Sequence, residues 1–146
     1  MPDGARAIRR IVVGANGTPG STRAVAWVSE VAPSLGAEVI AVHVLTYDRE
    51  LLRDLTPDTM RTWRTELAQK LRTSWSAPLV AAGVAHRCIV LEGETVTDVL
   101  GRVATEEEAD LLVVGTGGHT GVVGRLLGSV TDRLSHHAKV PIVVVP

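Results

Sequence analysis

Two glycine-rich segments carry the residue types best suited to ligand chemistry. One covers residues 14–20 and the other residues 115–124, and each follows a short apolar run. Glycine has no Cβ, so a bound group can approach the main chain closely at such positions. The second segment is long for a connection between a strand and a helix, and long loops in compact domains are usually functional or mobile. Both segments are therefore candidate binding loops.

A helix start follows the second segment. Ser129 precedes the acidic residue Asp132 by three positions, a variant of the capping box that predicts a helix beginning at Ser129. The free N–H groups of its first turn and the positive end of the helix dipole form an anion site. Gly115, Gly118 and Gly128 would let an extended phosphate reach the main chain. The spacing indicates the phosphates of a nucleotide, and a solvated connection before an ordinary capped helix is an equally open interpretation.

Better-known phosphate and hydrolytic motifs do not match. A P-loop needs a lysine after its last glycine, and neither Lys70 nor Lys139 lies in a glycine-rich segment. A dinucleotide fingerprint would need a glycine where Thr120 stands. The sequence has no G-x-S-x-G elbow and no H-E-x-x-H motif, and the adjacent His136 and His137 diverge on a helix. We therefore expect no catalytic residues and no metal ligands, with a weak ATPase activity left open.

The elements that position these loops alternate between strand and helix. Short apolar runs bounded by turn residues predict buried strands. Helical spacing predicts one helix that is capped by Thr18 and ends at Gly36. The polar stretch over 47–82 also has helical spacing, which Pro57 breaks and Pro78 ends. Two more helices are predicted, one capped by Thr95 and one that begins at Ser129. The alternation indicates an α/β, doubly wound (Rossmann-like) fold with a five-stranded parallel sheet of order 3-2-1-4-5 and four helices. The predicted strands are 11–13, 39–45, 84–91, 111–114 and 142–145.

Composition excludes several classes of protein. The 146 residues fit one domain over 1–146. The sequence is rich in Val, lacks Phe and is 45% hydrophobic, as expected for strands that are buried on two faces. A net charge of -1 gives no basic surface for nucleic acid. No window reaches the roughly 18 apolar residues of a membrane span. The single cysteine, Cys88, excludes an internal disulfide, so we expect a cytoplasmic protein.

Three residues or segments outside the glycine-rich loops have simple structural interpretations. His43 lies within an apolar run, where a histidine is usually a hydrogen-bonded core residue, and Cys88 is interpreted as a small buried hydrophobe. The flat apolar strand at 142–145 needs a cover if it lies at a sheet edge. Pairing with its copy across a two-fold axis predicts a homodimer through Val140–Val145.

The glycine-rich segments resemble those of the universal stress protein family. Gly115-x-x-Gly118, nine further residues and then Gly128-Ser129 resemble the family's ATP-binding motif G-x2-G-x9-G-[ST], and residues 11–18 resemble its first strand and loop. The resemblance implies the five-stranded parallel sheet, a homodimer and membership of the ATP-binding subclass.

The resemblance also implies roles for individual residues. Val44 matches the position whose main chain meets adenine, and Gly14 belongs to the first loop. Asn16 departs from the usual aspartate that faces the ribose, so it retains hydrogen bonding but brings no charge toward Mg²⁺ or Mn²⁺. Arg125 is the preferred candidate for neutralising phosphate charge. The residues that would hold ribose and phosphates are Gly115, Gly118, Gly128, Ser129 and the amide of Val130.

Three hypotheses about function follow. The first is a cytoplasmic stress-response protein that binds ATP and whose nucleotide occupancy is read by an unidentified regulatory partner. The second is a slow ATPase, or an enzyme that transfers an adenylyl or phosphoryl group to itself. The missing lysine and aspartate count against efficient metal-assisted transfer. The third is an interaction module that binds no nucleotide.

Overall fold

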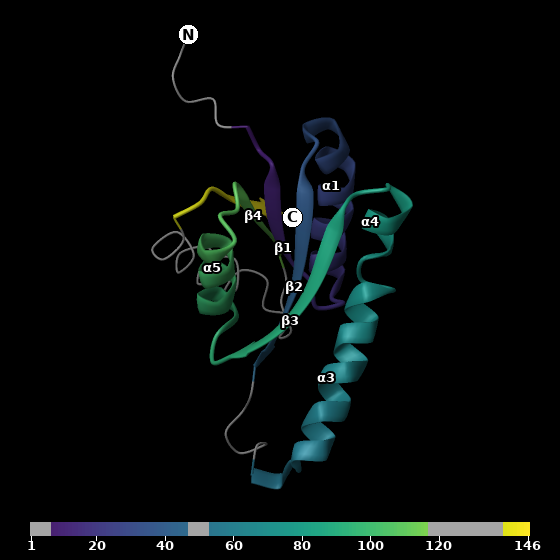
Figure 1. The fold of residues 1–146 in the computed structure, drawn as a ribbon, viewed down its shortest axis with the longest axis vertical. Helices are drawn as coiled ribbons and strands as arrows, with labels where there is room; N and C mark the ends of the chain where they lie inside the picture. Colours follow the sequence, from purple (N-terminus) through teal and green to yellow (C-terminus); the bar gives the residue numbers. More distant parts are fainter. Residues whose placement is uncertain (1–6, 47–52, 117–138) are drawn as a thin grey trace.

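Five parallel strands form a single sheet in the order β3-β2-β1-β4-β5, which confirms the predicted α/β doubly wound fold. The structure is a computed structural model that describes residues 7–46, 53–116 and 139–146 (Figure 1). The strands are β1 (Arg10–Gly14), β2 (Glu38–Thr46), β3 (His86–Gly93), β4 (Leu111–Gly115) and β5 (Ile142–Val145). The helices of the described ranges are α1 (Pro19–Leu35), α3 (Pro57–Arg72), α4 (Ala77–Ala81) and α5 (Val96–Glu106).

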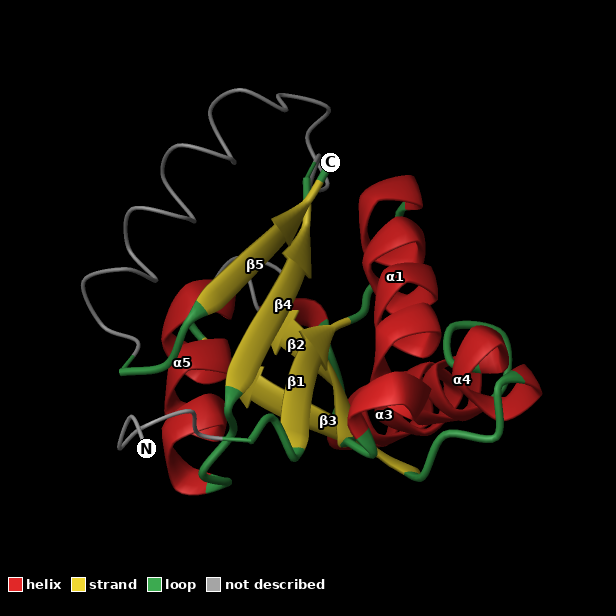
Figure 2. Ribbon diagram, turned by 90° about the horizontal axis from the view of Figure 1, so that it is seen from above, coloured by secondary structure: helices red, strands yellow, loops and turns green. Residues whose placement is uncertain are grey.

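The helices cover both faces of the sheet. Figure 2 shows α1, α3 and α4 on one face and α5 on the other. The central strand β1 supplies both cores, because Ile11 and Val13 pack toward α1 and Val12 packs toward α5. All three side chains are fully buried. Alternate residues of such a strand face opposite cores, which explains why β-branched Val dominates the sequence.

Helix α1 begins and ends where the sequence predicts. The side chain of Thr18 accepts a hydrogen bond from the Ser21 N–H, and Pro19 occupies the first helical position. Gly36 closes the helix in the left-handed region with φ of 63°. Both ends follow from residue type, since Thr accepts at an N-cap and Gly tolerates a positive φ.

The stretch after β2 differs from the prediction. Pro57 starts α3 and Pro78 lies in the first turn of the separate helix α4, whereas the sequence pattern predicts that they break and end one helical stretch. A proline has no N–H to contribute, and the first turn of a helix is where that N–H would be unpaired. Strand β3 also lies two residues later than expected, at His86–Gly93. The helix predicted to start at Ser129 lies outside the described residues.

Strand β5 lies at one end of the strand order, next to β4. Its side chains contribute to both cores, with Val143 and Val145 on the α1 side and Ile142 and Val144 on the α5 side. In the described ranges no strand pairs with its outer edge. The homodimer through Val140–Val145 stays a prediction.

None of the helices in residues 7–46, 53–116 and 139–146 has the length and apolar character needed to cross a membrane.

Candidate functional site

The ends of β1 and β4 form the centre of the candidate site. These two strands are neighbours, with Val13 opposite Val113, and the strand order reverses between them. Loops at such a reversal frame the ligand crevice of open α/β sheets. The described parts of the two glycine-rich segments therefore meet at one edge of the sheet.

Main chain packs directly on main chain where α1 meets β4. A Cβ built on Gly115 would lie 2.1 Å from the carbonyl oxygen of Gly20, and one built on Gly20 would lie 1.7 Å from the carbonyl oxygen of Thr116. Thr116 is held in turn by its N–H, which donates to the Val145 carbonyl at 3.1 Å. Gly115, predicted as a ligand contact, thus has a packing role that the sequence did not reveal.

Asn16 forms a local turn at the start of the first loop. Its Oδ1 accepts from the Thr18 N–H at 3.1 Å and from the Thr18 hydroxyl at 2.6 Å. A backbone N–H can only donate, so the atom facing it must be Oδ1, and Nδ2 is the donor on the other side of the amide. The Asn16 N–H donates to Ser21 Oγ at 3.1 Å, which ties the loop to α1.

The loop is also supported from β2. His43 is 7% exposed, and its Nδ1 lies 2.9 Å from the Ala15 carbonyl oxygen. A carbonyl only accepts, so Nδ1 carries the proton. The interpretation of His43 as a hydrogen-bonded core residue is confirmed. Sequence reasoning missed the residue beside it, Trp75, whose ring centroid lies 5.1 Å from that of His43.

Val44 and Gly14 lie on the α5 side of the same edge. Val44 is buried, belongs to the core that faces α5, and is opposite Leu91 in the register of β2 with β3. A Cβ on Gly14 would lie 3.2 Å from Leu100 Cδ1, so a larger residue would crowd α5. Of the other predicted site residues, Gly118, Arg125, Gly128, Ser129 and Val130 lie outside the described residues.

The described site loops carry no ionisable side chain, since residues 14–18 and 115–116 contain only Gly, Ala, Asn and Thr. No group of His, Cys, Asp and Glu able to hold a metal ion occurs in the described ranges. The hydrogen bond from Arg10 to Glu38 raises the pKa of that guanidinium above its usual range, but this pair lies at the amino end of β1, the edge opposite the site. A charged ligand at the described loops would therefore interact with backbone dipoles and not with charged side chains.

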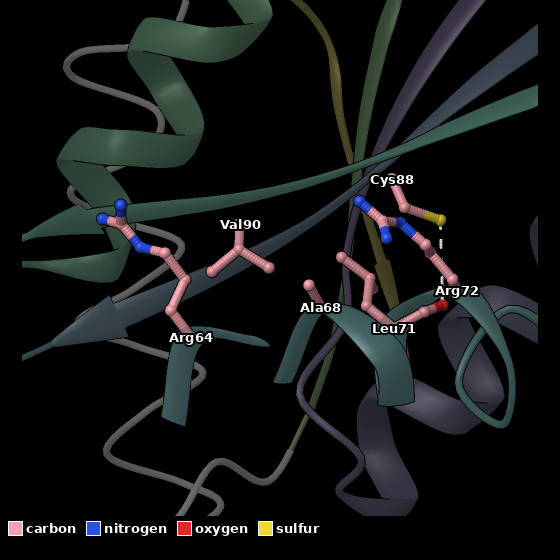
Figure 3. A pocket seen from close by; sticks show the side chains of 6 residues that line it. All are labelled: Arg64, Ala68, Leu71, Arg72, Cys88 and Val90. Carbon is pink, nitrogen blue, oxygen red and sulfur yellow. Dashed lines mark hydrogen bonds between the residues drawn. The ribbon is translucent and has the colours of Figure 1, made fainter. Parts of the chain in front are cut away.

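A hollow lies between α3 and β3, away from these loops (Figure 3). It measures about 200 Å³, and Cys88 opens onto it. The thiol is half-buried, with Sγ donating to the Leu71 carbonyl at 3.7 Å and 3.4 Å from Ser76 Oγ. Cys88 is thus less enclosed than the sequence suggested. The lining residues are Arg64, Ala68, Leu71, Arg72, Cys88 and Val90.

Comparisons with known proteins agree with this architecture. A sequence model of the universal stress protein family matches residues 7–146. A universal stress protein of Mycobacterium tuberculosis is 31% identical, and the alignment covers 95% of this chain and 97% of the relative. A universal stress protein solved in complex with cAMP is 27% identical, with a TM-score of 0.70, and the match covers 96% of this chain and 98% of that one. A family member from Burkholderia pseudomallei is 26% identical, with a TM-score of 0.74 and coverage of 98% and 99%.

Proposed function

Because the chain belongs to the universal stress protein family, we propose that it binds an adenine nucleotide at the loops that follow β1 and β4. The ligand we propose is ATP. A regulatory partner protein then distinguishes the nucleotide-bound from the free chain. In this proposal the chain is a stress-response regulator or sensor that acts in the cytoplasm.

One observation carries this proposal. The start of α1 at Gly20 and the end of β4 lie against each other where the strand order reverses, and Gly115 there begins the sequence G-x2-G-x9-G-S. The phosphate-binding part of the motif therefore starts at the edge of the sheet where a ligand is expected. A relative that is 27% identical and has the same fold was solved with cAMP, itself an adenine nucleotide, which supports the choice of base.

The described residues suit the ribose end of such a ligand. Asn16 lies in the first loop, and its side-chain amide would hydrogen-bond to the ribose hydroxyls. The main chain of Val44 would meet adenine. The phosphates would be held by the segment beyond Gly115, where Arg125 would supply positive charge. The contacts proposed for that segment are Gly118, Gly128, Ser129 and the Val130 amide.

A divalent cation would arrive with the nucleotide. Mg²⁺ prefers carboxylate and phosphate oxygens, and the described loops at 14–18 and 115–116 offer no carboxylate. Any Mg²⁺ or Mn²⁺ would therefore be held mainly by the phosphates. For the same reason we propose no efficient catalysis, because neither a general base nor a carboxylate to hold a metal ion occurs in those two loops.

We also propose that the protein forms a homodimer through β5. The strand is a sheet edge in the described part of the chain, and its apolar side chains are already packed on both faces. An edge strand of this kind is open to pairing through its main chain. Its copy, related by a two-fold axis, would satisfy those groups.

Titration calorimetry with ATP, ADP, AMP and cAMP tests the nucleotide proposal. We expect saturable binding of at least one of them, and loss of binding in Gly128→Val, where a branched side chain would occupy the phosphate position. The matched control is Gly101→Ala in α5, where a Cβ would meet nothing within 4 Å. No binding of any of the four at millimolar concentration would contradict the proposal, and retained affinity in Gly128→Val would remove that loop from the site.

A further inference from the structure

Trp75 connects the first glycine-rich loop to the corner between α3 and α4. The backbone N–H of Trp75 donates to the Lys70 carbonyl at 2.9 Å, which fixes the residue to the end of α3. Its indole contacts the His43 ring at a tilt of 55°. A Cβ built on Gly17 would lie 2.6 Å from Trp75 Nε1 and 2.7 Å from Cε2. The indole therefore lies where a side chain at position 17 would stand.

The two neighbours of Asn16 are thus held by one pair of aromatic residues. On one side, His43 donates from Nδ1 to the Ala15 carbonyl at 2.9 Å. On the other side, Trp75 packs against Gly17, whose φ of 78° lies in the left-handed region that glycine tolerates best. The main chain that carries Asn16 therefore lies between these two contacts.

We infer that Trp75 and His43 are positioning residues that fix the conformation of the loop carrying Asn16, and that Trp75 links this loop to the α3–α4 corner. The second part rests on the proposed function, because it concerns occupancy of the nucleotide site. Ser76, directly after Trp75, is fully buried, and α4 packs against α1, so the corner is anchored to the core. A shift of Gly17 on ligand binding would move the indole, and through it the α3–α4 corner.

A double-mutant cycle tests the contact without any ligand. Gly17→Ala, Trp75→Ala and the double variant are compared with the unmodified protein by urea unfolding. Gly17→Ala is strained by its positive φ in both backgrounds, but it meets the indole only when Trp75 is present. We expect its shift in midpoint to be clearly smaller in the Trp75→Ala background. Equal shifts in the two backgrounds would overturn the inferred contact.

Nucleotide affinity tests the positioning role. We expect Trp75→Ala to weaken nucleotide binding about tenfold, a loss of about 1.4 kcal/mol. The conservative variant Trp75→Phe, which retains a ring beside His43, should restore most of the affinity. The control is Trp63→Ala, a residue of α3 with 37% exposure, which should bind like the unmodified protein. Unchanged affinity in Trp75→Ala, measured where the variant is folded, would overturn the positioning role even if its stability falls.

The link to the corner has a spectroscopic test. In the variant Trp27→Phe/Trp63→Phe, Trp75 is the remaining tryptophan of the three in the sequence. Adding cAMP or ATP should change its emission, while the variant Trp27→Phe/Trp75→Phe, which keeps Trp63, should not respond. Binding by calorimetry with no change in Trp75 emission would overturn the link. If the unmodified protein binds no nucleotide at all, the proposed function fails, and the unfolding cycle still decides the contact.

Discussion

Replacing Gly115 by Ala tests how strongly the backbone contact between β4 and α1 limits this fold. The new Cβ would lie 2.1 Å from the carbonyl oxygen and 2.3 Å from the carbonyl carbon of Gly20. Ordinary van der Waals contact begins at 3.4 Å, so the atoms would be more than 1 Å too close. Both partners are main chain, and neither can rotate away as a side chain would. The start of α1 would have to move from the sheet.

The size of the effect follows from the cost of overpacking. Such insertions cost about 1–3 kcal/mol and occasionally more. The contact involves backbone on both sides, so we expect Gly115→Ala to lose about 3 kcal/mol of the free energy of unfolding, at the upper end of that range. Urea unfolding slopes for small proteins are about 1–3 kcal/mol per molar, so the midpoint should fall by roughly 1 M or more. Circular dichroism in urea, without nucleotide, is the measurement.

Gly101→Ala is the matched control. Gly101 lies inside α5, and a Cβ there would meet nothing within 4 Å. Alanine is favoured over glycine in a helix interior by about 0.5–1 kcal/mol, so this variant should be more stable than the unmodified protein. A midpoint for Gly115→Ala equal to that of the unmodified protein would refute the reasoning, because it would mean that α1 and β4 do not approach as described.

Three further predictions concern the loop, the thiol and the edge strand. Thr18→Ala removes the hydroxyl that accepts from the Ser21 N–H and donates to Asn16. It should lower the free energy of unfolding by about 1 kcal/mol, measured in urea. The control Thr22→Ala, at an exposed position of α1, should lower it much less. Equal costs would contradict the capping role. Cys88 should react with Ellman's reagent to one equivalent per chain, and faster in urea than in the native protein, since its Sγ is half-buried and hydrogen-bonded to Leu71. Equal rates would show the native thiol to be open. The carbonyls of Pro141 and Val145 accept from the N–H groups of Leu112 and Thr116, so the alternation of a parallel ladder directs the N–H of Val144 to the outer edge. Val144→Pro should therefore shift a homodimer toward monomer in sedimentation equilibrium, and an unchanged dimer would exclude pairing through β5.

The elements that local chemistry determines could be predicted from the sequence. Strands β1 and β4 are short runs of Ile, Leu and Val because both of their faces are buried, and a run of that kind is recognisable without any partner. The ends of α1 follow from Thr18, Pro19 and Gly36. The prediction for the stretch over 47–82 was wrong in detail because a proline breaks a helix interior but begins a helix equally well, and only packing decides which occurs.

Contacts between distant segments could not be predicted in the same way. Gly20 and Gly115 are far apart in the sequence, and nothing in either segment indicates that the other fills the space beside it. Trp75 lies in a connection between helices, and its contact with Gly17 depends on how α3 returns to the sheet. His43 was recognised as a core residue, but its bond to Ala15 required the register of β2 beside β1.

The packing role of Gly115 changes how substitutions at this site must be interpreted. The first glycine of the motif is required by α1 whether or not a phosphate binds. Lost nucleotide binding in a Gly115 variant therefore does not by itself assign a ligand contact to that residue. A substitution that leaves the fold unchanged is needed to separate the two effects.

Asn16→Asp offers that separation. An aspartate at this position would keep an oxygen for the Thr18 N–H and hydroxyl, and would replace only the donor Nδ2 by a second, charged oxygen. The turn would persist while the chemistry offered to a ribose or a cation reverses. We expect Asn16→Asp to keep the two bonds to Thr18, and with them the turn, and to bind nucleotide or Mg²⁺ with a different affinity. Such a difference, measured by calorimetry where both proteins are folded, would report the chemistry that position 16 offers to the ligand, because the bonds to Thr18 are the same in both. Equal affinities would remove position 16 from the site.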